Sequence, residues 1–210
     1  MAEHAEYRSA GPEDLPAVAR VFLAAFPESV RHYAGGPMRP RVVEDLFAIC
    51  LDAEPEAFFV ATVDGQVVGY VFAPSRFPGL AWLAVSRGHL LRMMWRWVSG
   101  RYGIGLRPVS IALRNGLLLL RAARRAERDA RILSIAVDPA CRGRHVGTGL
   151  MRAALAYLAS RRVGRVRLEV RPWNAAATHL YRKLGFRSAG RTRDTQGEWV
   201  VMAKETDAGM

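Results

Sequence analysis

The residues with the clearest chemical potential lie in a glycine-bearing segment of the C-terminal half. Residues 131–137 read as a strand, 138–147 as a loop, and about 148–161 as a helix. Small residues let a backbone turn tightly, and the N–H groups and dipole at a helix start favour an anion. The segment therefore predicts a phosphate site, although an ordinary strand-to-helix turn would give the same pattern.

Two common phosphate-binding motifs are excluded for this loop. A P-loop requires Gly-Lys-Ser/Thr, which does not follow here, and the dinucleotide fingerprint G-x-G-x-x-G fails at Arg152. The loop thus predicts an anion site, but its sequence does not identify which anion binds there.

A second segment places a carboxylate, an asparagine and a tyrosine at fixed spacing. It predicts a strand over 165–170 that carries Glu169, and a helix over 174–184 that carries Tyr181 and stops at Gly185. A base must take a proton from an attacking amine, and an acid must serve the leaving group. Residues 174–186 match the pattern N-x-x-A-x-x-L-Y-x-K-x-G-F at every defined position. The segment resembles the GNAT acetyltransferase superfamily.

The resemblance implies the GNAT fold, an α/β (α+β) protein in which helices flank a twisted mixed central sheet whose two central strands splay apart. It implies acetyl-CoA as co-substrate in that opening, and no metal. The pantetheine arm would pair with the backbone of Ile135, Ala136 and Val137, and Asn174 would bond this arm or cap its helix. The pyrophosphate would lie on the loop, whose cofactor-binding residues are Arg142, Gly143, Arg144, His145, Val146, Gly147 and Thr148.

The loop departs from the family signature R/Q-x-x-G-x-G/A at one position. His145 stands where the first glycine is expected. Backbone amides bind phosphate beside a residue of another type too, so the assignment is kept. His145 either touches the cofactor or is a solvated loop histidine.

The resemblance also implies direct acyl transfer in a ternary complex. Tyr181 matches the family's tyrosine acid, with positioning of the sulfur as the alternative role. Many members carry a glutamate where this chain has Ser134, so the next candidate base is Glu169, twelve positions before Tyr181. This arrangement resembles the RimI-like protein N-terminal acetyltransferases, in which the matching glutamate is the proposed base. The alternative for Glu169 is a strand carboxylate paired with Arg167 or Arg171.

The rest of the chain predicts elements in the order of that fold. We expect a strand over 7–10, a helix with Leu15, Val18, Ala19, Phe22 and Phe26 on one face, a loop after Pro27, and a helix over 40–51 that buries Val43, Leu46, Phe47 and Cys50. Two hairpins are expected, 57–63 with 66–73 across Asp64-Gly65, and 186–193 with 198–203.

The charge of the 210-residue chain is concentrated in one segment. The formal net charge is +12, and the stretch between Asp64 and Glu127 holds ten arginines, no lysine and no acidic residue. We expect one GNAT domain over 1–210, with a core of 1–74 and 131–210 and a basic helical insertion over 75–130 between the third and fourth strands. Two cysteines in no CxxC pattern exclude a disulfide scaffold.

The insertion predicts two amphipathic helices, over about 80–98 and 108–128, and the first has His89, Arg92 and Arg96 on one face. Packing on the core, shaping the acceptor site, homodimerisation and binding to an anionic membrane surface stay open for it, and nucleic acid is disfavoured. Its aromatic and histidine side chains either line an acceptor pocket or pack on the core: Trp82, His89, Trp95, Trp97 and Tyr102.

The acceptor amine is a small molecule or a protein N-terminus, and the arginines suggest an anionic one. No apolar stretch reaches the roughly 20 residues that span a bilayer. We therefore expect a cytoplasmic protein, with membrane association as the alternative.

Overall fold

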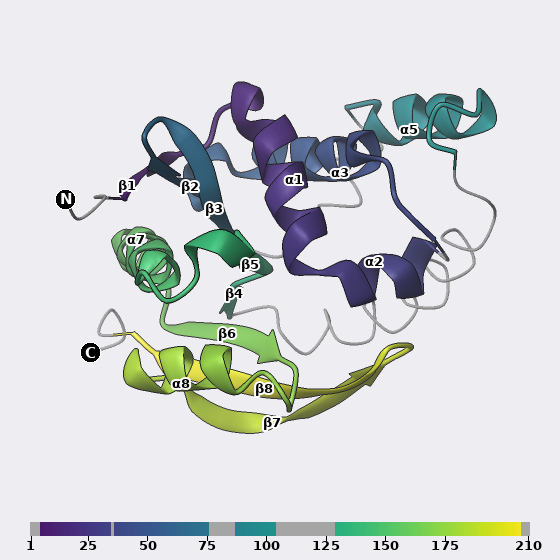
Figure 1. The fold of residues 1–210 in the computed structure, drawn as a ribbon. Coiled ribbons are helices and arrows are strands. Elements are labelled where there is room, and N and C mark those ends of the chain that lie inside the picture. The colour runs from purple at the N-terminus through teal and green to yellow at the C-terminus, as the bar shows by residue number, and fades with distance from the viewer. Residues whose placement is uncertain (1–4, 35, 76–86, 104–128, 207–210) are drawn as a thin grey trace.

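The computed structural model describes residues 5–34, 36–75, 87–103 and 129–206. Within these ranges the strands form two four-stranded sheets, in the orders β1-β2-β3-β5 and β4-β6-β8-β7 (Figure 1). The strands are β1 (Glu6–Ser9), β2 (Phe58–Val63), β3 (Gln66–Phe72), β4 (Ala130–Arg131), β5 (Ser134–Val137), β6 (Arg165–Val170), β7 (Arg187–Asp194) and β8 (Gly197–Glu205). Only β4 and β6 pair in parallel among them, so the strands form the mixed α/β arrangement that the sequence predicts.

The chain passes from one sheet to the other between β4 and β5. The N–H of Ile132 donates to the carbonyl of Arg167 on β6 (N···O 2.9 Å). The next N–H, that of Leu133, donates to the carbonyl of Phe72 at the end of β3 (N···O 2.9 Å). Because β4 pairs with β6 while β5 pairs with β3, β5 and β6 diverge from this point, as the resemblance implied.

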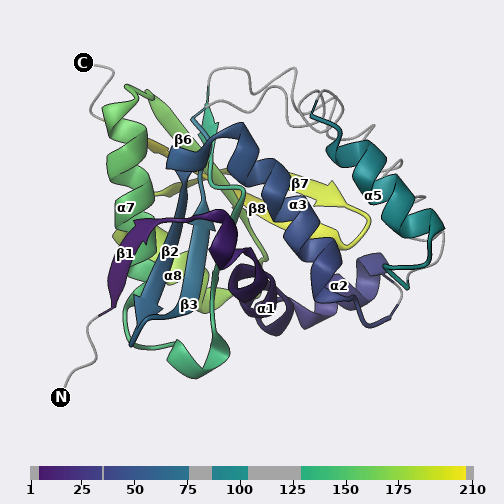
Figure 2. The same cartoon turned by 90° about the horizontal axis from the view of Figure 1, so that it is seen from above.

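Helices cover both faces of the first sheet: α1 and α3 lie on one face and α7 on the other (Figure 2). The helices are α1 (Leu15–Ala25), α2 (Pro27–Ala34), α3 (Pro40–Ala53), α5 (His89–Val98), α7 (Val146–Ser160) and α8 (Ala175–Lys183), with single turns η1 (Pro12–Asp14), η2 (Pro55–Ala57) and η3 (Pro139–Cys141). Alternation along β3 produces the two layers, since Tyr70 and Phe72 pack with α1 and α3 while Val71 packs with α7.

Both expected hairpins are confirmed. Asp64 and Gly65 have φ of 49° and 73°, the left-handed pair that a two-residue turn needs to match the twist of its strands. The second hairpin joins β7 to β8, and Asp194 pairs with Gly197 at its tip.

The segment after Pro27 is the helix α2 and not the expected loop. Proline is well suited to a first helical turn, where its missing N–H has no partner to lose. Glu28 in the first turn and Arg31 and His32 in the last complement the helix dipole.

The expected buried face of α3 is wrong at one position. Val43 and Phe47 are buried as expected, but Leu46 is 46% exposed, and Val42 and Leu51 are buried as well. The buried stripe is therefore rotated away from Leu46.

The described part of the insertion contains α5, which packs against α3. This helix begins at His89 after Gly88, whose φ is 71°, and residues 80–86 of the helix expected over 80–98 lie outside the described residues. The expected helix over 108–128 and Trp82 lie outside the described residues. Among the helices that are described, none is long and apolar enough to cross a bilayer.

Candidate active site

Strand β5 is an edge strand within the described residues. Ile135, Ala136 and Val137 pair with β3 on one side, and the other side faces the diverging β6. In an antiparallel pair, part of the backbone N–H and C=O groups of each strand points away from its partner. This edge therefore offers backbone groups to an extended ligand, as expected for a pantetheine arm.

The loop after β5 needs two left-handed residues before α7 can begin. Gly143 has φ of 80°, and His145, the N-cap residue of α7, has φ of 60°. The position where the family signature has glycine is thus a position whose backbone favours glycine. His145 adopts this conformation in spite of its side chain.

The amides of this loop are not equivalent. The N–H of Arg142 donates to the carbonyl of Pro139 (3.4 Å), and that of Thr148 donates to the carbonyl of His145 (3.0 Å). The N–H groups of Val146 and Gly147 belong to the first turn of α7, before its first intrahelical bond. These two amides are therefore the best oriented for an anion, whereas Arg142 and Thr148 use theirs within the loop.

A cavity of about 440 Å³ opens at the start of α7. It is lined by Tyr7, His145, Thr148, Gly149, Arg152, Leu180, Lys183 and Leu184. The basic side chains of Arg152 and Lys183 give it a charge complementary to phosphate groups. It joins the glycine-bearing loop to the last turns of α8, two segments that sequence analysis treated separately.

Tyr7 enters this cavity from β1, at the other end of the chain. A Cβ atom on Gly149 would lie 2.0 Å from Cζ of Tyr7, so the missing side chain of Gly149 is what lets the ring approach. Burial raises the pKa of Tyr7, while the positive charge of Arg152 opposes this shift. Sequence analysis missed Tyr7, because no local pattern links β1 to α7.

Helix α8 positions Asn174 and Tyr181. The Oδ1 atom of Asn174 accepts the N–H of Ala177 (3.1 Å), which confirms the capping role expected for this side chain. Tyr181 is 6% exposed and packs on Phe186, with ring centroids 6.0 Å apart. Burial raises the pKa of Tyr181 to about 12, so the phenol keeps its proton throughout the physiological range.

Glu169 on β6 forms an ion pair with Arg131 on the adjacent strand β4. Glu169 is thus a strand carboxylate paired with an arginine, but with neither of the two expected partners, since Arg167 pairs with Asp129 (3.7 Å) and Arg171 with Asp194 (3.9 Å). The side chain of Glu169 is 31% exposed, so the ion pair does not bury it fully. Ser134, by contrast, shares a hydrogen bond with the buried hydroxyl of Tyr70 (2.8 Å) and offers no base.

Helix α2 meets the β7–β8 turn through three side-chain contacts. Ser29 bonds Gln196 (3.0 Å), His32 lies 3.3 Å from the hydroxyl of Thr195, and Tyr33 donates to Asp194 (2.9 Å). Burial of Tyr33 and its hydrogen bond to the carboxylate of Asp194 raise the pKa of Tyr33 to about 12. Because these contacts join segments more than 160 positions apart, no local pattern predicts them.

Arg171 follows β6 and lies between two tryptophans near this contact. Its guanidinium carbon is 3.6 Å from the ring centroid of Trp199 and 5.4 Å from that of Trp173. The Nη1 atom donates to the carbonyl of Glu198 (3.2 Å), whereas the buried Nη2 atom has no hydrogen-bond acceptor among the described residues.

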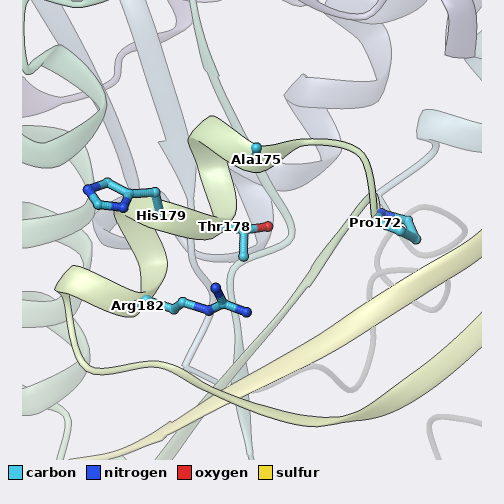
Figure 3. A pocket seen from close by; sticks show the side chains of 5 residues that line it. All are labelled: Pro172, Ala175, Thr178, His179 and Arg182. Atoms are coloured by element: carbon cyan, nitrogen blue, oxygen red, sulfur yellow. The ribbon is translucent and has the colours of Figure 1, made fainter.

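A second hollow of about 410 Å³ lies along one face of α8 (Figure 3). It is lined by Pro172, Ala175, Thr178, His179 and Arg182. None of the predicted site residues lines it. Neither cavity includes a residue of 87–103, which does not support the alternative that aromatic side chains of the insertion line an acceptor pocket. His89 and Tyr102 are buried, as the packing alternative expects, whereas Trp95 is 67% exposed.

The site combines an edge strand, an anion-binding helix start and a protonated buried phenol. The chain matches the model of the acetyltransferase (GNAT) family over residues 16–186. The protein belongs to the GNAT family. Acetyl transfer from acetyl-CoA to an amine is the reaction general to this family. The edge of β5, the amides at the start of α7 and the basic cavity beside them fit this molecule.

Two curated relatives match this GNAT enzyme over 60 residues, or 29% of its length. The mycothiol acetyltransferase of Amycolatopsis mediterranei is 45% identical over that stretch, which is 20% of its own length. The N-alpha-acetyltransferase RimI of Mycobacterium tuberculosis is 47% identical, over 36% of its length. An N-alpha-acetyltransferase of Sulfurisphaera tokodaii matches more broadly, at 26% identity over 86% of this chain and 78% of that relative.

Solved structures show the same fold at low identity. A Pyrococcus horikoshii protein superimposes with a TM-score of 0.64 at 16% identity, over 97% of this chain and 99% of that one. The ribosomal-protein-S18-alanine N-acetyltransferase of Escherichia coli gives a TM-score of 0.55 at 21% identity, over 96% and 94%. A putative acetyltransferase of Salmonella typhimurium, solved with its cofactor acetyl-CoA, gives 0.60 at 14%, over 97% and 94%.

Proposed function

We propose that this enzyme transfers the acetyl group of acetyl-CoA directly to the α-amine of a polypeptide N-terminus. The buried, protonated phenol of Tyr181 carries the proposal of direct transfer. The acceptor class is supported by the Sulfurisphaera tokodaii and RimI relatives, both named N-alpha-acetyltransferases. A small-molecule amine, as the name of the mycothiol acetyltransferase suggests, is the competing acceptor.

We assign the co-substrate to the edge of β5 and to the cavity at the start of α7. The backbone of Ile135, Ala136 and Val137 would hold the pantetheine arm, and Asn174 would reach it from α8. The amides of Val146 and Gly147 would hold the pyrophosphate, with the basic side chains of the cavity beside them. Gly143 and His145 act mainly by shaping the loop, since both adopt the left-handed conformation.

In this proposal Tyr181 donates to the leaving sulfur of acetyl-CoA, which supplies the acetyl group as a thioester. A thiol has an ordinary pKa of about 8.5, well below the pKa of about 12 of this phenol. Tyr181 therefore stabilises the sulfur first as a hydrogen-bond donor. The proton moves fully from the phenol to the sulfur only if burial raises the pKa of the leaving thiol toward that of the phenol.

Glu169 is the proposed base, and its surroundings suit an α-amine. An α-amine has a pKa of about 7.7–8.0, against about 10.4 for lysine, so much of it is already neutral near pH 8. Arg131 fixes the orientation of the Glu169 carboxylate, which still accepts hydrogen bonds through its exposed part. Such a base needs to complete only a modest deprotonation.

On the acceptor side, the peptide would lie near α2 and the β7–β8 turn. The Nη2 atom of Arg171 is a donor without an acceptor among the described residues, and a backbone carbonyl is a chemically matched partner.

The test is the rate of thiol release from acetyl-CoA with a peptide acceptor, in the wild type and in Tyr181→Phe. We expect kcat to fall about 10²-fold with little change in KM for the peptide, the size typical of removing one acid catalyst. Tyr157→Phe is the matched control, because its phenol also has a pKa raised to about 12 but donates to Glu54, away from the site. Equal losses in both variants, or none in Tyr181→Phe, would refute the role of Tyr181.

A further inference from the structure

Helix α5 meets the rest of the protein with its charged side. The Nε2 atom of His89 lies 2.7 Å from the carboxylate of Asp52 on α3, and His89 is buried. Arg96 bonds both carboxylate oxygens of Asp45, which is buried too. These contacts fix which side of α5 faces inward.

The opposite side of α5 is apolar and points to solvent. Leu91, Met94, Trp95 and Val98 are 67%, 50%, 67% and 71% exposed, and we call them the α5 stripe. They recur at i, i+3, i+4 and i+7, so they form one continuous face of the helix. A surface helix normally buries such a face against the core, and α5 has the reverse orientation. In Figures 1 and 2, α5 lies on the outer side of α3, away from α7 and α8.

The charges around the α5 stripe favour one occupant over the others. Arg87 and Arg101 are exposed at its ends, and Arg92 is exposed at its edge although one of its nitrogens lies 3.8 Å from the carboxylate of Asp45. No acidic residue occurs between Asp64 and Glu127. A second copy of the chain would bring the same positive charges into contact. Nucleic acid is bound through cations and not through an aliphatic face, and Arg96 is already paired. An anionic lipid surface satisfies both the apolar stripe and its basic edge.

We propose that the α5 stripe inserts into the interface of an anionic lipid bilayer while the charged side of α5 stays bound to α3. Trp95 has the amphipathic ring that favours the headgroup level, and the aliphatic residues reach the acyl boundary. The exposed arginines at the edge pair with headgroup phosphates and carboxylates.

The experiment is cosedimentation of the whole protein with vesicles of phosphatidylcholine containing about one third phosphatidylserine. We expect the protein in the pellet with these vesicles, and far less of it with pure phosphatidylcholine or at high salt, because screening weakens the charge attraction. Leu91→Ser/Trp95→Ser should lower the partition coefficient about 100-fold, since each buried side chain contributes roughly tenfold. Trp173→Ser is the matched control, because Trp173 is equally exposed but lies outside the stripe.

Three results would overturn the proposal. The first is that the intact protein stays in the supernatant with anionic vesicles, and the second is that the double variant binds them as well as the wild type. The third is that Leu91→Ser/Trp95→Ser lowers Tm by several degrees or abolishes a dimer seen without vesicles, because either change would show that protein already covers the α5 stripe. An unchanged Tm together with lost vesicle binding supports the proposal and separates it from a folding defect.

Discussion

The protonation of Tyr181 makes a quantitative prediction about stability at alkaline pH. The ordinary pKa of tyrosine is 10.0, and in the folded enzyme that of Tyr181 is raised to about 12. Above pH 10 the unfolded chain therefore releases this proton while the folded chain keeps it, so stability falls as pH rises from 10 to 12. Between pH 8 and pH 11, these two values remove about 1.4 kcal/mol of unfolding free energy through this one group.

Urea unfolding of the wild type and Tyr181→Phe at pH 8 and pH 11 measures this contribution. The variant lacks the phenol, so its stability relative to the wild type should improve by about 1.4 kcal/mol between the two pH values. The difference in phenolate absorbance between the two proteins should show one group titrating near pH 12 in the folded state and near pH 10 in urea. A folded midpoint near 10, or parallel pH profiles, would refute the view of Tyr181 as a buried, protonated donor.

Three further substitutions test the geometry around the site and the insertion. His145→Gly should raise the unfolding free energy measured by urea titration by about 0.5–1 kcal/mol, because it removes left-handed backbone strain at φ 60°. A lower unfolding free energy would contradict the left-handed conformation of residue 145. Gly69→Ala places a Cβ 3.0 Å from Leu150 and 3.1 Å from the carbonyl of Ala136 on β5, so it should cost about 1–3 kcal/mol and weaken the thermal shift with acetyl-CoA. If binding stays at the wild-type level, β5 is not the cofactor strand. Asp45→Asn leaves Arg96 without its carboxylate partner and should lower the stability of α5 by about 3 kcal/mol, which faster hydrogen exchange in α5 would show. Unchanged exchange would contradict the view that the charged face of α5 packs inward.

Much of the site was predictable because its signals are local in sequence. The helix that carries Tyr181 is defined by the cap at Asn174 and the stop at Gly185, and both are as expected. The Asp64-Gly65 hairpin follows from a residue pair that suits two left-handed positions in succession. The strand edge at Ile135 to Val137 came from the family resemblance, and the divergence of β5 from β6 agrees with it.

The features that sequence reasoning missed depend on partners far away in the chain. Tyr7 reaches the α7 cavity only because Gly149 has no side chain, and Arg131 meets Glu169 only because β4 and β6 pair in parallel. The amphipathic pattern of α5 defines two faces but does not say which one is buried. Ion pairs with Asp45 and Asp52 decide that the charged face turns inward, and those acids lie on another helix.

The central claim is acetylation of a polypeptide α-amine, and product analysis tests it most directly. The enzyme is incubated with acetyl-CoA and a peptide that carries both a free α-amine and one lysine, beside an amino sugar at equal concentration. Fragmentation mass spectrometry then locates the acetyl group. We predict acetylation at the α-amine of the peptide, lost in Tyr181→Phe and retained in Tyr157→Phe. Acetylation of the lysine side chain, or of the amino sugar with no reaction of the peptide, would contradict this account.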